Sequence, residues 1–348
     1  MESNHPISLR TSVKWFDNIV STIGLALNSI LLYLIINKTS ARLKDYRPIL
    51  IQNCLIDTFF SIVNMMAKTQ IDQKDGNFFM YMIGPLDNIN APYNNLIICF
   101  WVFSLFYCLT GVPVQFIYRY LIIVKGIKVT LSNYFALLFS AFVPPLLYAL
   151  WTTYCFWPNE VTWKKGAELL KVDHVYDEGI PNFVTASIDE WPLRVLFSYA
   201  YFLVICVYII TVFSNLKVWR HLKSMESQMS VQAKDAQRQI TVTLIFQAII
   251  PCVVCIIPIG SAATMTVLHT NVPGLSLVMA LLYSAIPFAN PLLTLIVIKN
   301  YRNGMISMFR KICGMKKQKV VPTATSIVLQ TTHVSEEKIS SNVFEQLT

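Results

Sequence analysis

Long apolar stretches alternate with short polar connections along most of this chain. A helix needs about 20 apolar residues to cross a hydrocarbon layer about 30 Å thick. The stretches that reach this length are Asp17–Asn37, Pro48–Ala67, Asn94–Ile117, Ser132–Phe156, Leu193–Leu216, Ile240–Leu268 and Pro273–Ile298. The pattern therefore predicts an all-α membrane protein, built as a seven-transmembrane helix bundle. We number these predicted helices one to seven.

The remaining segments complete the predicted organisation. The apolar run Phe78–Leu86 is too short to span a membrane and ends at Gly84-Pro85, so we place it in a loop. Residues 1–16 form the N-terminal segment, and helix one is expected to act as an uncleaved signal anchor. The helical domain covers 17–312 and includes a short amphipathic helix at its end, and the polar tail 313–348 is predicted to be disordered.

Composition supports a membrane protein and excludes other classes. Hydrophobic residues make up 55% and charged residues 14%, against about 45–50% and about 25% in soluble domains. The net charge of +9 resides in the connections between apolar runs. This placement argues for membrane topology and against a nucleic-acid partner.

The distribution of Lys and Arg predicts the orientation. The connections that follow helices one, three, five and seven hold more than twice as many Lys and Arg residues as the segments on the other side. Positive residues are retained in the cytoplasm, so the N-terminus is expected outside and the C-terminus inside. The sequon Asn37-Lys38-Thr39 would then face the cytoplasm, and a glycan on Asn37 would mean that the topology is inverted.

Polar residues at similar depths predict an interior network. Asp57 would cost about 2.5–3.5 kcal/mol to insert into a membrane, so a compensating role is expected. By helical rise, Asn28, Asp57 and Asn290 lie about 12–14 Å from the inner ends of their helices. Gln247 lies closer to the inner end of its own helix, at about 10 Å. Two interpretations stay open: these groups bind the helices together, or they form a hydrated network that repacks during switching, with Asp57 changing its protonation.

Prolines, cysteines and histidines narrow the chemistry further. Prolines that predict kinks in the spans are Pro113, Pro144, Pro145, Pro251, Pro258, Pro287 and Pro291. Seven of the 8 cysteines fall in apolar stretches and are interpreted as small buried hydrophobes; whether Cys99 and Cys155 are bridged stays open. The histidines are scattered, and no metal-ligand or catalytic spacing occurs. We therefore expect no metal, no cofactor and no enzymatic activity.

Motifs at the helix ends resemble those of a known family. Helix three closes with Gln115-Phe116-Ile117-Tyr118-Arg119-Tyr120, helix six opens with Arg238-Gln239 and carries Gln247, Pro251 and Pro258, and helix seven contains Asn290-Pro291 before Lys299-Asn300-Tyr301-Arg302. In this order they resemble the nematode chemoreceptors of the Str superfamily, which are seven-transmembrane G-protein-coupled receptors. The resemblance covers residues from about Ile19 to Arg310.

The likeness to the broader rhodopsin-like class is looser. Tyr118 replaces the acid that precedes the helix-three arginine, and Thr294 occupies the tyrosine position after Asn290-Pro291. Ile256 stands where a tryptophan is expected, and the second outer loop has no cysteine to bridge to helix three. These departures leave the receptor class intact and concern the details of the switch.

The resemblance implies a chemosensory, olfactory-type receptor for a small odorant-like ligand. By depth, the predicted ligand contacts are Trp101, Ser104, Tyr107, Met279 and Tyr283, which offer aromatic walls and few hydrogen-bonding groups. The alternative for each is ordinary helix packing. The expected location is the plasma membrane, in sensory neurons or their cilia.

Residues at the inner face are predicted to meet a heterotrimeric G protein. Arg119, Tyr118 and Arg238 are the proposed coupling residues, although Arg119 could also be an unpartnered positive-inside charge. The connection Lys217–Gln239 is expected to extend helices five and six, and Tyr301–Ile312 to form an amphipathic helix on membrane lipid. Cys313 beside it is a palmitoylation candidate, with an unmodified thiol as the alternative.

A polytopic transporter of a small solute is the main alternative function. Transporters commonly show internal repeats and several ionisable groups within the membrane. This sequence shows no repeat and a single acid, Asp57, deep in a span. The sequence therefore favours the receptor.

Overall fold

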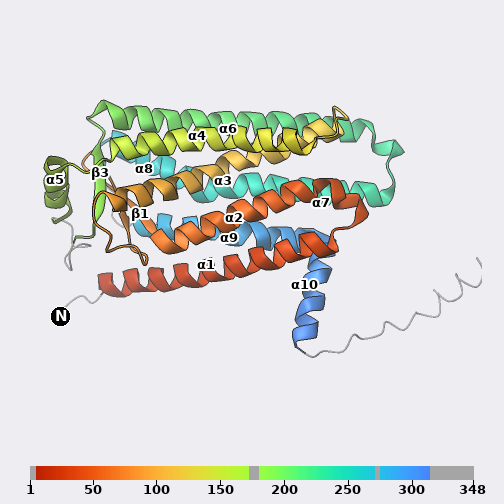
Figure 1. The fold of residues 1–348 in the computed structure, drawn as a ribbon, viewed down its shortest axis with the longest axis horizontal. Helices are drawn as coiled ribbons and strands as arrows, with labels where there is room; N and C mark the ends of the chain where they lie inside the picture. Colours follow the sequence, from red (N-terminus) through yellow and green to blue (C-terminus); the bar gives the residue numbers. More distant parts are fainter. Residues whose placement is uncertain (1–4, 172–179, 271–274, 314–348) are drawn as a thin grey trace, which may run out of the picture. The chain divides into compact units, whose positions relative to one another are not determined.

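The computed structural model describes residues 5–171, 180–270 and 275–313, most of which are helical (Figure 1). The predicted disordered tail, apart from Cys313, and the start of the seventh span at Pro273 lie outside these residues. Met1–Met305 and Ile306–Thr348 form separate compact units, and the fold described below is that of the first.

Long helices form the body of the first unit. They are α1 (His5–Lys38), α2 (Arg47–Ala67), α3 (Tyr93–Ile123), α4 (Leu131–Cys155), α6 (Trp191–Ser224), α7 (Val231–Pro251), α8 (Ile257–Val267) and α9 (Leu275–Val297). By length and composition, six helical stretches of the described chain could cross a membrane, and α9, counted with α10 (Lys299–Ile312), raises this number to seven. The predicted seven-helix bundle is confirmed.

Helix α3 forms the centre of the bundle. It packs against α2, α4 and α6, while α1 packs mainly against α9 and α2. In the most apolar 18-residue stretch of α3, 83% of the residues are buried, whereas in those of α4 and α6 only 28% are buried. A helix that is apolar all round belongs in the interior or in lipid, and here α3 takes the interior while α4 and α6 present apolar faces outward.

The sixth span is interrupted near its middle. A π-helical turn, η4 (Cys252–Ile256), joins α7 to α8 directly after Pro251. Pro258 is the second residue of α8, the helix that follows this turn. Such π turns replace the usual hydrogen-bond ladder locally and often occur at functional sites.

Short elements connect the helices at the end of the bundle where α3 carries Arg119. The 3-10 helix η1 (Ala41–Tyr46) links α1 to α2, and η3 (Glu226–Gln228) lies between α6 and α7. Helix α6 extends to Ser224, and α7 begins at Val231 with Ser230 as its N-cap, whose hydroxyl accepts from the Ala233 amide. The connection Lys217–Gln239 is therefore largely helical.

A small antiparallel sheet closes the other end of the bundle, which we call the sheet end. Its strands are β1 (Thr69–Lys74), β2 (Asn77–Met82) and β3 (Phe183–Ser187), in the order β1-β2-β3. Lys74 pairs with Asn77, so Asp75 and Gly76 form a two-residue hairpin turn with φ of 46° and 71°. The prediction of a loop over Phe78–Leu86 missed strand β2.

The two faces of the sheet pack against different partners. Phe78, Met80 and Val184 belong to the core of the helix bundle. Phe79, Tyr81 and Phe183 form a second cluster with Ala167 and Leu170 of the short helix α5 (Glu160–Lys171). Alternate residues of a strand point to opposite faces, so the sheet and α5 form two layers over the end of the bundle.

Candidate functional site

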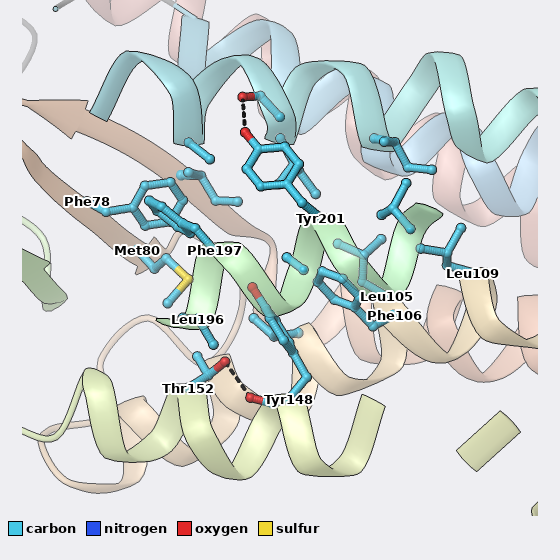
Figure 2. A pocket seen from close by; sticks show the side chains of 18 of the residues that line it. Phe78, Met80, Leu105, Phe106, Leu109, Tyr148, Thr152, Leu196, Phe197 and Tyr201 are labelled. Atoms are coloured by element: carbon cyan, nitrogen blue, oxygen red, sulfur yellow. Dashed lines mark hydrogen bonds between the residues drawn. The ribbon is translucent and has the colours of Figure 1, made fainter. Parts of the chain in front are cut away.

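A cavity lies beneath the sheet, between α3, α4, α6 and α8 (Figure 2). Its volume is about 80 Å³, which suits a compact molecule or a few waters. The residues that line it are Ile71, Phe78, Met80, Trp101, Val102, Leu105, Phe106, Leu109, Tyr148, Thr152, Phe156, Leu196, Phe197, Ala200, Tyr201, Val204, Ile256, Ile259, Gly260 and Ala263. None of these lining residues is charged, so the cavity disfavours an ionic ligand.

One hydroxyl is available inside this apolar cavity. The Thr152 hydroxyl donates to the Tyr148 carbonyl at 2.8 Å, and the Tyr201 hydroxyl donates to the Gly260 carbonyl at 3.0 Å. The Tyr148 side chain is 6% exposed, and its ring extends among the other lining side chains (Figure 2). Within the described chain its hydroxyl has no hydrogen-bond partner, so it is free to bond a polar group of a ligand.

Of the five predicted ligand contacts, the structure places Trp101 at the cavity. Its indole nitrogen donates to Asn64 Oδ1 at 2.8 Å, and its ring lies 5.4 Å from the ring of Tyr283. Met279 and Tyr283 are buried in the same core cluster but do not line the cavity.

The other two predicted contacts also do not line the cavity. The Ser104 hydroxyl donates to the Trp101 carbonyl at 2.7 Å. Tyr107 stacks on Phe103, with ring centres 5.7 Å apart, and meets the edge of Phe142 on α4. Depth along a helix does not fix the direction of a side chain around it, which is why Tyr148 and Tyr201 were missed. Phe78 and Met80 were missed because they were assigned to a loop.

The polar residues predicted at a common depth do meet in the interior. Asn290 Nδ2 lies 3.1 Å from both carboxylate oxygens of Asp57, and Asn53 Nδ2 donates to Asp57 Oδ2 at 3.2 Å. Gln115 on α3 donates to Asn53 Oδ1 at 2.9 Å. The carboxyl of Asp57, 2% exposed, is thus held by amides from two helices.

The network continues toward the sixth span. Gln247 Nε2 donates to the Thr294 hydroxyl at 3.1 Å, and Thr294 donates to the Asn290 carbonyl at 2.9 Å. Thr294 stands where the rhodopsin-like class has a tyrosine, and its hydroxyl connects α9 to α7. We call Asn28, Asp57, Gln247, Asn290, Thr294 and their direct partners the polar network.

Proline connects Asn28 to this network. Pro291 has no N–H, so the Pro287 carbonyl, four residues earlier, lacks its helical donor. Asn28 Nδ2 supplies a donor at 2.9 Å. The approach is close because Gly24 lies against the same turn, where an added Cβ would be 3.2 Å from Phe288 N. Asn28 and Pro291 therefore join α1 to α9.

Trp101 lies beside the helix that carries Asp57. The Trp101 ring packs on Phe60 of α2, with ring centres 6.4 Å apart, and bonds to Asn64 of the same helix. Asp57, Phe60 and Asn64 lie on one face of α2, since residues three and four apart share a face. A shift of Trp101 would thus act on the helix that holds the polar network.

Arg119 makes a second polar cluster at the end opposite the sheet. It is 1% exposed, and its Nη2 donates to the Thr241 hydroxyl at 2.6 Å and to Gln237 Oε1 at 3.2 Å. Gln237 Nε2 in turn donates to the Tyr46 hydroxyl at 2.7 Å. We call these four residues the arginine clasp, because they hold α3 against α7 and η1.

The guanidinium is only partly satisfied by this clasp. Within the described chain, Nε and Nη1 of Arg119 are buried without a hydrogen-bond partner. Burying a cation is costly unless its hydrogen bonds are made. The acceptors that hold Arg119 are the neutral side chains of Thr241 and Gln237, and Tyr118 occupies the position where the rhodopsin-like class has an acid.

Tyr118 and Arg238 lie outside the clasp. The Tyr118 hydroxyl donates to the Asp45 carbonyl at 3.0 Å, which fixes the connection between α1 and α2. Arg238 is exposed about two turns into α7. Nearby, Lys299 Nζ lies 2.8 Å from Asp235 Oδ2 and joins α7 to the first residue of α10.

Cysteines and metal ligands add no further site in the described chain. Cys99 and Cys155 are both free thiols, and Cys313 is exposed. Among the residues that the structure describes, no group of three or more His, Cys, Asp and Glu side chains could hold a metal ion.

Comparisons with known proteins agree with the geometry. Residues 13–306 match the family described as the serpentine type seven-transmembrane G-protein-coupled chemoreceptor Str. G-protein coupled receptor str-33 of Caenorhabditis elegans is 22% identical over 345 residues, covering 93% of this chain and 98% of the relative. G-protein coupled receptor str-217 of the same organism is 24% identical over 326 residues, covering 86% and 90%.

The fold of this chain is similar to that of a solved structure. The crystal structure of squid rhodopsin aligns with a TM-score of 0.51 at 14% identity, covering 92% of this chain and 91% of that chain. At this identity the likeness concerns the fold alone.

Proposed function

Since this chain belongs to the Str family of serpentine seven-transmembrane chemoreceptors coupled to G proteins, we propose that the cavity beneath the sheet is its ligand site. The family and the rhodopsin-like fold make the chain a G-protein-coupled chemosensory receptor, and they do not favour the transporter alternative. The inferences below concern the ligand, the orientation and the switch.

The ligand that fits this cavity is a compact, uncharged molecule with one hydrogen-bonding group. The observation that carries this inference is the Tyr148 hydroxyl, which is buried and free within the described chain, while the hydroxyls of Thr152 and Tyr201 in the same lining are already bonded. A ketone, ester or alcohol would pair with this hydroxyl, while its hydrocarbon part would contact Phe106, Leu196 and their neighbours. Met279 and Tyr283 would act from behind, by holding Trp101 in position.

The sheet end is proposed to face the exterior, and the arginine clasp the cytoplasm. Lys and Arg are concentrated on the clasp side, as expected for cytoplasmic connections. A heterotrimeric G protein would then contact Arg119, Arg238 and the ends of α6 and α7. We also propose that the receptor resides in the plasma membrane of sensory neurons or their cilia. Tyr301–Ile312 would lie on the membrane beside an acylated Cys313.

Switching would run from the cavity through the polar network to the clasp. A ligand that displaces Trp101 moves α2 through Asn64, and α2 carries Asp57 against Asn290. Gln247 and Thr294 link α9 to α7, whose Thr241 holds Arg119. Release of the arginine would open the cytoplasmic face to the G protein.

A panel of volatile and water-soluble odorants, applied to cells expressing the receptor with a second-messenger readout, tests this proposal. Compounds of the predicted class should activate it. Ala263→Phe, which fills the cavity, should abolish the response, whereas Ile205→Phe on the outward face of α6 should leave it intact.

The Tyr148 hydroxyl is tested with the same compounds. Tyr148→Phe should lower the potency of a carbonyl or alcohol ligand about tenfold, as expected for one lost hydrogen bond, and leave a hydrocarbon analogue unchanged. Unchanged responses in both Ala263→Phe and Tyr148→Phe would refute the cavity as the ligand site. Solute uptake without second-messenger change would instead restore the transporter.

A further inference from the structure

The direct route from the sheet end into the cavity is closed. Ile71, Phe78 and Met80 of the sheet form the wall of the cavity on that side, and each is no more than 5% exposed. The opposite face of the sheet is covered by α5 through Phe79 and Tyr81. A ligand arriving along the bundle axis would have to displace both layers.

A larger hollow at the sheet end does not provide a way around these layers. It has a volume of about 670 Å³ and lies among α5, β3 and the segment 90–94. Among the residues that the structure describes, Phe156 alone lines both this hollow and the cavity. Phe156 is 1% exposed and packs edge-on against Phe78, so it separates the two spaces.

The side wall between α6 and α8 is thinner. The close helix partners of α6 are α3 and α4, and its link to α8 here is the side chain of Tyr201. The Tyr201 hydroxyl lies 3.0 Å from the Gly260 carbonyl and 3.1 Å from the Thr264 hydroxyl. Opposite the ring stands a residue without a side chain, Gly260, where an added Cβ would still be 3.8 Å from the ring.

Tyr201 also borders the outside of the bundle. It lines the cavity and is 42% exposed, on a helix whose neighbouring residues Phe202 and Ile205 are exposed as well. An exposed apolar face on a membrane-spanning helix contacts lipid. Tyr201 and Phe197 further line a second pocket of about 350 Å³, whose lining also includes Asp189, Arg194 and His269 at the polar boundary of the sheet end. The two rings thus form a partition between the cavity and a surface pocket.

We propose that the ligand enters sideways from the bilayer, through the seam between α6 and α8, with Tyr201 as the gate. This inference rests on the proposed function, since it takes the cavity as the ligand site, and it adds that the ligand partitions into lipid. Rotation of the Tyr201 ring breaks its bonds to α8 and opens the passage above Gly260. The adjacent π turn, which contributes Ile256 to the cavity wall, lets α8 move without breaking a regular helix.

Thiol labelling tests the route without an identified ligand. The full-length receptor carrying Leu105→Cys, on the α3 side of the cavity, is placed in lipid nanodiscs. It is then treated with apolar benzyl methanethiosulfonate or with the smaller, uncharged and water-soluble 2-hydroxyethyl methanethiosulfonate. Peptide mass mapping distinguishes this thiol from the native cysteines. After each rate is divided by the rate of the same reagent with a free thiol in water, the apolar reagent should label it at least tenfold faster than the hydroxyethyl reagent, because only the apolar reagent concentrates in the bilayer. Equal corrected rates would mean entry from water and overturn the proposal.

Two variants locate the passage on the Leu105→Cys background. Gly260→Phe should slow apolar labelling at least tenfold, and Tyr201→Phe, which keeps the ring and loses the hydrogen bonds, should accelerate it. Ile257→Phe, on the lipid-facing side of α8, is the matched control and should have no effect. Unchanged melting temperatures confirm folding, and Thr264→Trp narrows the same seam if Gly260→Phe does not fold.

The outcomes separate this inference from the proposed function. Labelling that neither Gly260→Phe nor Tyr201→Phe alters would refute the lateral route, even if Ala263→Phe abolishes odorant responses. Conversely, lateral labelling that obeys both variants, in a receptor whose responses survive Ala263→Phe, would keep the route and reject the cavity as the signalling site.

Discussion

Buried polar side chains carry most of the specific chemistry of this receptor at the scale of single residues. Asp57, Asn290 and Asn28 were expected at a common depth, because helical rise alone fixes depth. The structure adds what depth cannot give, namely that Asn28 bonds the carbonyl freed by Pro291 rather than Asp57 itself. The direction of a side chain around its helix depends on packing, so ligand contacts chosen by depth included Ser104 and Tyr107, which lie off the cavity.

Removing one partner of the Asp57–Asn290 contact should destabilise the bundle. Asn290→Ala leaves the buried carboxyl with fewer donors and should cost about 1–2 kcal/mol. Thermal unfolding in nanodiscs measures the loss. Ser140→Ala, whose exposed hydroxyl bonds only its own turn, is the control and should change stability by less than about 0.5 kcal/mol. Equal stability of Asn290→Ala and wild type would contradict a structural role for the contact.

The arginine clasp should restrain basal signalling. Thr241→Val keeps the shape of the side chain but removes the nearer of the two acceptors of Arg119, so basal G-protein activation should rise several-fold as the population shifts. Nucleotide exchange without ligand is the readout. Thr243→Val on the same helix is the matched control, since that hydroxyl bonds only the Gln239 carbonyl. The clasp would have no restraining role if both variants showed wild-type exchange.

At the scale of elements, the helices were predictable and the sheet was missed. Apolar runs of membrane length defined the spans, although α1 begins at His5, well before the predicted start of helix one. The hairpin has a local signal in the sequence, since Asp75-Gly76 is a preferred two-residue turn, and Phe78, Met80 and Met82 alternate with Phe79 and Tyr81. Pairing with the distant strand Phe183–Ser187 left no local signal, because it is set by tertiary packing.

The hairpin turn should be sensitive to one glycine. Gly76 has φ of 71°, and an added Cβ would meet the His269 ring at 2.5 Å, so Gly76→Ala should cost about 1–2 kcal/mol. Asp75→Gly at the neighbouring position, with φ of 46°, removes strain and should be nearly neutral. Thermal unfolding compares the two. A turn that tolerates both substitutions equally would not be held in the described conformation.

At the scale of the whole molecule, orientation follows from charge and is directly testable. Asn90→Thr creates an acceptor sequon at Asn88, which is exposed at the sheet end. This site should be glycosylated in cells, while the native sequon at Asn37 on the opposite side should stay unmodified. A mobility shift removed by glycosidase provides the measurement. Glycan on Asn37 alone would invert the proposed topology.

The central claim is that a ligand beneath the sheet releases the arginine clasp at the other end. Spin labels at Lys125→Cys and Val231→Cys, both exposed near the clasp ends of α3 and α7, report their separation by double electron–electron resonance. With a compound that activates the receptor in the odorant panel, the distance distribution should shift to longer values by several ångströms, as helix displacement requires. An unchanged distribution in a sample that nevertheless activates its G protein would contradict the account.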